Sequence, residues 1–140
     1  MTEMQTPPPQ VWPTLRADDA RALIRFLVEA FGFEETAVHG DGDRVDHAEL
    51  SWPPGGGIML GSGNRGDNDP WALRPGTFGC YVVTDDPDKL YERAVAAGAD
   101  IIREPSDTDY GAREFAARDP EGNLWSFGTY RGEPRSVPAQ

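Results

Sequence analysis

The stretch from Asp109 to Tyr130, DYGAREFAARDPEGNLWSFGTY, is typical of two β-strands joined by a tight turn. We expect the strands over Arg113 to Arg118 and over Leu124 to Tyr130. Between them, Pro120 fixes φ for the first central position of a turn, and Gly122 can adopt a positive φ at no steric cost. The stretch therefore predicts a β-hairpin.

Bulky apolar residues alternate with small or polar ones along this hairpin. The bulky residues are Phe115, Trp125 and Phe127. Because successive side chains of a strand point to opposite faces, we expect these three to face a layer of helices. The opposite face of the hairpin is then open, and a ligand could lie on it.

The same order of signals occurs twice along the chain. In each half a strand precedes a helix that an aspartate caps and a glycine ends, and three further strands follow. We expect one domain over residues 11–130, made of module one (11–61), a linker (62–76) and module two (77–130). Residues 1–10 and 131–140 are expected to be disordered tails. The prediction is an α+β fold, two βαβββ modules whose curled sheets form a cleft.

Each expected helix has an apolar stripe, which we expect to face the core. The stripes consist of Ile24, Leu27, Val28 and Phe31 in the first helix and of Leu90, Ala94 and Ala97 in the second.

Composition excludes several classes of partner. The chain has 140 residues and a formal charge of −11, so a nucleic-acid backbone would be repelled. No apolar run approaches the roughly 20 residues that span a bilayer. The start, MTEMQTPPPQ, lacks the basic and apolar regions of a secretory signal, which indicates a cytoplasmic protein. Cys80 is the only cysteine and lies in an apolar run, where we expect a small, buried core residue.

The segment RDPEGNLWSFG, with the preceding Tyr-Gly-x-Arg-Glu-Phe, resembles the last hairpin of the glyoxalase/bleomycin-resistance/extradiol-dioxygenase superfamily, also called the vicinal oxygen chelate superfamily. The resemblance covers roughly Val11 to Tyr130. It implies two half-cups that meet in one cleft, and a homodimer that covers their inner surface.

The resemblance also implies where a metal would be held in an enzyme of this superfamily. The ligands come from the first, fourth, fifth and eighth strands, and the matching positions here hold Trp12, Met59, Gly79 and Ser126. None of these is a normal ligand for a hard or borderline divalent cation, so we expect neither a metal nor another cofactor.

An alternative set of metal ligands stays open. His47 and Glu49 are two residues apart on one expected strand and therefore share a face, and Asp107 or Asp109 could add a third ligand.

The resemblance favours a metal-free small-molecule-binding protein, similar to the bleomycin-type proteins that sequester an antibiotic and so confer resistance. The alternative is a metal-dependent glyoxalase-like lyase, isomerase or dioxygenase, which leaves catalysis open. Alternation predicts an aromatic and apolar cleft with a few acids, which suits a planar, aromatic or cationic organic molecule. The predicted ligand-binding residues are Trp12, Thr14, His47, Glu49, Met59, Tyr81, Glu114 and Ser126.

Overall fold

The computed structural model describes residues 8–63 and 69–134, which form two four-stranded sheets. The first sheet has the order β1-β4-β3-β2, from Thr14–Ala17, Gly57–Ser62, Arg44–Ser51 and Glu34–Asp41. The second has the order β5-β8-β7-β6, from Gly79–Val83, Leu124–Gly128, Arg113–Arg118 and Asp100–Asp107. Neither sheet closes on itself, and the α+β fold of two βαβββ modules is as predicted. The expected tails and linker lie partly outside the described residues, at 1–7, 64–68 and 135–140.

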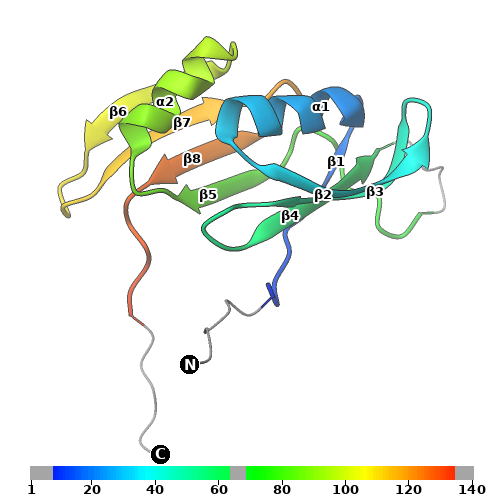
Figure 1. Ribbon diagram of the computed structural model, residues 1–140, viewed down its shortest axis with the longest axis horizontal. Helices are drawn as coiled ribbons and strands as arrows, with labels where there is room; N and C mark the ends of the chain where they lie inside the picture. The colour runs from blue at the N-terminus through cyan, green and yellow to red at the C-terminus, as the bar shows by residue number, and fades with distance from the viewer. Residues whose placement is uncertain (1–7, 64–68, 135–140) are drawn as a thin grey trace, which may run out of the picture.

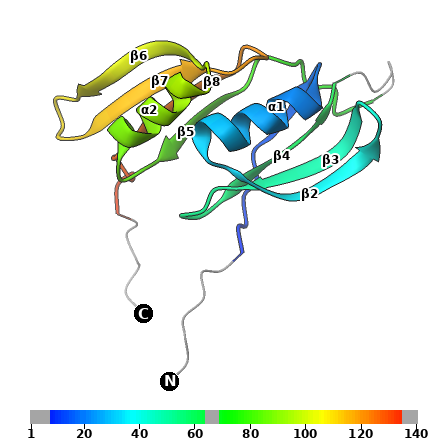
Figure 2. The ribbon, with the colours of Figure 1, turned by 45° about the horizontal axis from the view of Figure 1, so that its top comes forward.

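Helices cover one side of both sheets. Helix α1 (Ala20–Phe26) continues into a π-helical segment, η1 (Leu27–Phe31), and α2 (Pro87–Ala96) is its counterpart in the second module. Figures 1 and 2 show both helices on the same side, while the described segments that flank the sheets, residues 8–13 and 129–134, extend from the other. No helix within the described ranges is long and apolar enough to cross a membrane.

The predicted hairpin is confirmed, and its turn geometry occurs twice. In the β7–β8 turn, Asp119 N donates to Asn123 O at 3.0 Å and Gly122 N donates to Asp119 O at 3.0 Å. The β3–β4 turn has the same two hydrogen bonds. Trp52 N donates to Gly56 O at 3.0 Å, and Gly55 N donates to Trp52 O at 2.8 Å. The two modules are therefore related position by position.

The core runs continuously from one module to the other. Phe115, Trp125 and Phe127 are fully buried on the helix side of β7 and β8, as predicted. The Phe31 ring of η1 lies 4.6 Å from the Phe127 ring and 5.6 Å from the Trp125 ring, measured between centroids. Burying four large aromatic side chains in one cluster contributes several kcal/mol to stability.

Some strand boundaries differ from those that the sequence pattern predicts, which are Val11 to Arg16 for the first strand, Thr77 to Thr84 for the fifth and Ala99 to Glu104 for the sixth. β1 begins at Thr14, not Val11, because Pro13 has no N–H and only its carbonyl joins the pairing, accepting from Met59 N at 2.9 Å. β5 is shorter than expected and ends at Val83, β8 ends at Gly128, and β6 extends to Asp107.

Two helix residues also lie elsewhere than predicted. Ala97 is exposed, because α2 ends at Ala96 and Gly98 turns the chain with a φ of 84°. Val28 is only half-buried, because the π-helical turn rotates the buried face toward Ala30. The other predicted stripe residues are buried.

Three sets of hydrogen bonds join the modules. The Glu121 carboxylate of the β7–β8 turn accepts from Asp18 N at 2.7 Å and Asp19 N at 2.9 Å, at the start of α1. Trp52 Nε1 donates to Val83 O at 3.0 Å. The Arg93 guanidinium donates to the carbonyls of Val28 and Glu29, where η1 ends. The relative position of the two sheets is thus held by specific polar contacts as well as by the core.

Candidate ligand-binding site

The open face of the first sheet carries a row of predicted site residues. Thr14, Met59 and Glu49 occupy adjacent register positions on β1, β4 and β3. His47 lies two residues before Glu49, and its Nε2 is 2.8 Å from Glu49 Oε2. His39 on β2 is the register partner of His47, and the two imidazole rings stack with their centroids 6.4 Å apart. This face therefore combines an acid, two imidazoles and an apolar thioether.

Trp12 also reaches this sheet, packed against its backbone. A Cβ atom at Gly57 would lie 2.7 Å from the Trp12 ring, so only glycine leaves room for the indole there. Trp12 Nε1 donates to Pro9 O at 3.3 Å, and the residue is half-buried. One edge of the ring is thus occupied by the protein itself.

The open face of the second sheet carries the remaining predicted residues. Tyr81 and Ser126 are register partners on β5 and β8. A Cβ atom at Gly128 would lie 2.8 Å from Tyr81 Oη and 2.9 Å from Glu114 Cβ, so the phenol crosses the backbone beside Glu114. The Glu114 carboxylate pairs with Arg103 at 3.2 Å.

Two tyrosines that the sequence analysis did not single out stand beside Tyr81. Tyr81 Oη donates to the Tyr130 carbonyl at 2.6 Å, and the Tyr110 and Tyr130 rings make an edge contact at 5.6 Å. We call Tyr81, Tyr110 and Tyr130 the tyrosine group; they are 41%, 60% and 37% exposed. Tyr110 belongs to the motif that marks the family resemblance, and this was the one signal that pointed to it.

Two phenols of this group, those of Tyr81 and Tyr130, are held in their neutral form. Partial burial of Tyr81 and then the charge of Glu114 raise its pKa. A hydrogen bond to Glu133 is the main cause that raises the pKa of Tyr130. At neutral pH the rings of Tyr81 and Tyr130 are therefore uncharged, with electron-rich faces that suit a cation.

The predicted residues thus form two sets on two sheets. Trp12, Thr14, His47, Glu49 and Met59 belong to the first sheet, and Tyr81, Glu114 and Ser126 to the second. Two cavities of about 410 and 350 Å³ lie in the described part of the chain. Among these eight residues, Tyr81 lines the first cavity, and none lines the second. The sets lie on the open faces and are exposed to different degrees.

The side chains present do not fit the divalent metal of the superfamily's enzymes. Within residues 8–63 and 69–134, no three His, Cys, Asp or Glu side chains are grouped as a metal site. His47 and Glu49 give two donors, and Asp107, one of the two residues suggested as a third ligand beside Asp109, pairs with Arg113 at 3.1 Å. The thioether of Met59 and the hydroxyl of Ser126 do not replace the missing donors.

Comparisons with known proteins agree with this fold and place the chain in a family. The model of the Glyoxalase/Bleomycin resistance protein/Dioxygenase superfamily matches residues 10–127. The chain belongs to this superfamily.

Relatives and solved structures extend the comparison. An uncharacterized protein of Mycobacterium bovis is 32% identical over 126 residues, covering 86% of this chain and 82% of its own. The crystal structure of TioX from Micromonospora sp. ML1 has 28% identity and a TM-score of 0.70, covering 84% of this chain and 97% of TioX. TnmS3, an antibiotic binding protein from Streptomyces sp. CB03234, shares the fold with a TM-score of 0.66 and 21% identity, covering 89% of this chain and 97% of TnmS3.

Proposed function

We propose that this protein binds a small organic molecule on the open faces of its sheets without the help of a metal. The observation that carries the proposal is the lack of metal-binding side chains where the superfamily's enzymes have them. The family resemblance assigns Met59 and Ser126 to two of the positions where the superfamily's enzymes hold their metal, and His47 and Glu49 supply only two donors. The faces instead present aromatic, apolar and acidic side chains, which bind organic molecules by stacking and charge.

The ligand class that fits these faces is a planar aromatic cation. Glu49 and Glu114 supply a carboxylate on each sheet, and the tyrosine group adds neutral ring faces. The net charge of −11 would speed the arrival of a cation and make the rate fall with salt. The fold is shared with TnmS3, an antibiotic binding protein, and the biological role that we propose is the binding and sequestration of an antibiotic.

A homodimer would complete the site. Leu124 and Tyr81, on the open face of the second sheet, are 49% and 41% exposed. A second copy could cover these side chains and bring the open face of one chain opposite that of the other. We therefore propose that the ligand lies between two subunits.

The test is a titration with 10-methylacridinium, a planar aromatic cation, and with acridine, its uncharged analogue at mildly alkaline pH. We expect the cation to bind more tightly. Glu114→Gln and Trp12→Ala should each weaken its binding by about tenfold, since a charge or a cation–π contact is worth roughly 0.5–2 kcal/mol. Glu104→Gln, at an exposed position of β6, is the matched control and should have no effect.

Equal affinity for the two compounds, unchanged in Glu114→Gln and Glu49→Gln, would rule out the cationic ligand. A melting curve for Trp12→Ala separates the two roles of that side chain. A variant that melts like the native protein and binds weakly shows a contact with ligand, whereas a variant that unfolds shows a purely structural residue.

The alternative function is a metal-dependent lyase, isomerase or dioxygenase, and the His47–Glu49 contact at 2.8 Å is the observation that favours it. Elemental analysis of purified protein decides the point. About one divalent metal per chain, lost in the double variant His47→Ala/Glu49→Ala, would favour the enzyme over the binding protein.

A further inference from the structure

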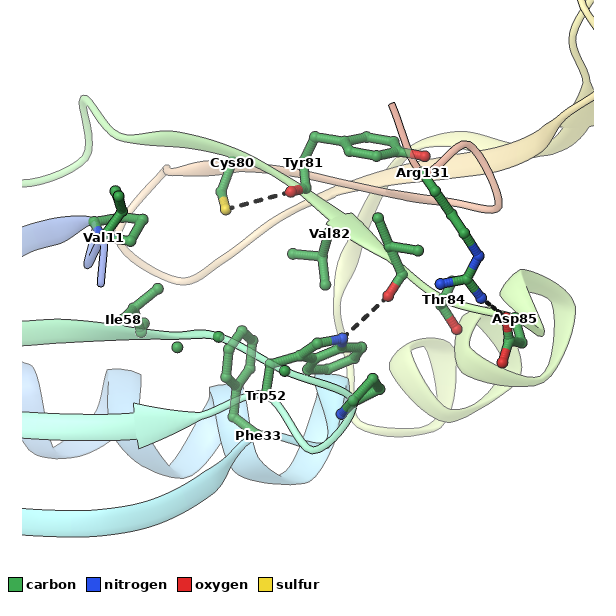
Figure 3. A pocket seen from close by; sticks show the side chains of 16 residues that line it. Val11, Phe33, Trp52, Ile58, Cys80, Tyr81, Val82, Thr84, Asp85 and Arg131 are labelled. Atoms are coloured by element: carbon green, nitrogen blue, oxygen red, sulfur yellow. Dashed lines mark hydrogen bonds and ion pairs between the residues drawn. The ribbon is translucent and has the colours of Figure 1, made fainter. Parts of the chain in front are cut away.

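A cavity of about 410 Å³ lies between β5 and the β3–β4 turn, where the two modules meet. Its walls are apolar, with Phe33, Trp52 and Val82 prominent, and one end is polar, formed by Thr84, Asp85 and Arg131. In Figure 3, Cys80 and Val82 point from β5 into this space, while the Tyr81 side chain points to the other face of the strand. The cavity is therefore separate from the open face that carries the tyrosine group.

The origin of the cavity is clear from the repeated module. At the other junction between the modules, Glu121 fills the space between the β7–β8 turn and the start of α1. The matching position of the β3–β4 turn holds Pro54, which has no carboxylate, and glycines follow at 55–57. A Cβ atom at Gly55 or Gly56 would meet nothing within 4 Å. One junction is thus closed by a side chain, and the other is left open.

The lining defines the chemistry of an occupant. The Phe33 and Trp52 rings pack 5.0 Å apart with their planes tilted by 54°, and together they give the cavity an aromatic wall. The charges at the polar end are already paired, because Arg131 Nη2 contacts Asp85 Oδ1. The Trp52 indole N–H is also in use, as it donates to Val83 O. An additional ion would find no unpaired opposite charge in this ion pair, whereas a hydroxyl or carbonyl can share in its hydrogen bonds.

We propose that this cavity is a second binding site, which takes a flat, uncharged aromatic molecule bearing a hydroxyl or carbonyl group. Its volume falls within the range of small-molecule sites, and junctions between modules are frequent places for them. The ring lies along Phe33 and Trp52, and the oxygen points to Arg131 and Thr84. The site is independent of the proposed function, because its ligand differs in charge and lies on the other face of β5.

Cys80 gives the test a direct reporter, because it is the only cysteine and its side chain borders the cavity. The experiment measures the rate at which iodoacetamide alkylates Cys80 in the full chain as 2-naphthol is added. Burial raises the pKa of the thiol, so the reaction is run at mildly alkaline pH. At about ten times the Kd of 2-naphthol, alkylation should slow by roughly tenfold, since only the empty cavity reacts.

Two variants test the two ends of the site. Cys80→Phe fills the cavity and should abolish the rise in melting temperature that 2-naphthol gives the native chain. Val95→Phe, the matched control at a 48% exposed position of α2, should keep it. Arg131→Ala retains the thiol and alters only an exposed side chain, so it should fold; it should weaken protection of Cys80 by about fivefold.

Three results would overturn the proposal. One is alkylation that 2-naphthol does not slow. Another is protection of Cys80 that follows protein concentration without naphthol, which would mean that a second copy covers the cavity. The third is displacement of 2-naphthol by 10-methylacridinium, which would mean a single site. Failure of 10-methylacridinium to bind at all would refute the proposed function and leave this site standing.

Discussion

Asp119 is almost fully buried, yet its carboxylate has four hydrogen-bond donors. They are the backbone N–H groups of Glu121 and Asn123, Asn123 Nδ2 and Trp125 Nε1, at 2.9–3.0 Å. The carboxylate thus ties the turn to the central tryptophan of the core. A buried charge is tolerated when its acceptor positions are filled in this way.

Asp119→Ala should therefore destabilise the protein by about 3 kcal/mol, because it leaves several buried donors without an acceptor. Urea unfolding measures the change. Asp100→Ala removes the same side chain from an exposed pair with Arg118 and should cost less than about 1 kcal/mol. Equal losses in the two variants would contradict the role given to Asp119.

Turn chemistry and alternation predicted the residues of the second hairpin well, because both depend on neighbours in sequence. Cys80, expected from its apolar run to be a buried core residue, packs against the core but is only partly buried, and it borders a cavity. That cavity exists because Pro54 and three glycines come opposite β5 in space. The contact between Tyr110 and Tyr130 likewise depends on two segments that are 20 residues apart and meet only in the folded chain, so no local sequence pattern predicts it.

At the scale of elements, the β7–β8 turn acts as a connector between modules. Through Glu121 it binds two backbone N–H groups at the start of α1, which the helix itself cannot satisfy. Glu121→Ala should lower the free energy of unfolding by about 1–2 kcal/mol, and Glu121→Gln by less, since the amide keeps one acceptor. Urea unfolding again gives the measurement.

Glu104→Ala is the control for this variant, because Glu104 is exposed on β6. It should leave the unfolding curve unchanged. A loss in Glu121→Ala no larger than in Glu104→Ala would show that the contact with α1 contributes nothing to stability.

Helix boundaries show where element prediction from sequence fails. A constant period of 3.6 residues placed Val28 and Ala97 on buried faces. The π-helical turn of η1 changes that period, and α2 ends before Ala97, so neither residue is buried. The first deviation comes from the change of helical period in η1, and the second from a helix that ends one residue earlier than the stripe assumed, before Gly98 turns the chain.

At the scale of the whole molecule, the open faces of the two sheets are the surface that a dimer would use. Leu124→Glu places a charge at an apolar, 49% exposed position on the open face of β8 and should convert the proposed dimer to a monomer of 15.3 kDa. Light scattering at micromolar concentrations measures the mass. Val95→Glu, on the helix side, should leave the dimer intact. A native chain that is already monomeric would contradict the assembly.

The central claim is that the protein binds its ligand without a metal, and one measurement tests it most directly. The native protein is treated with excess EDTA, dialysed, and titrated with 10-methylacridinium beside an untreated sample. We predict saturable binding with the same Kd in both samples, and added salt should weaken the binding to the same degree in both. Loss of binding after EDTA, with recovery on adding back Zn²⁺, Ni²⁺, Mn²⁺ or Fe²⁺, would contradict it.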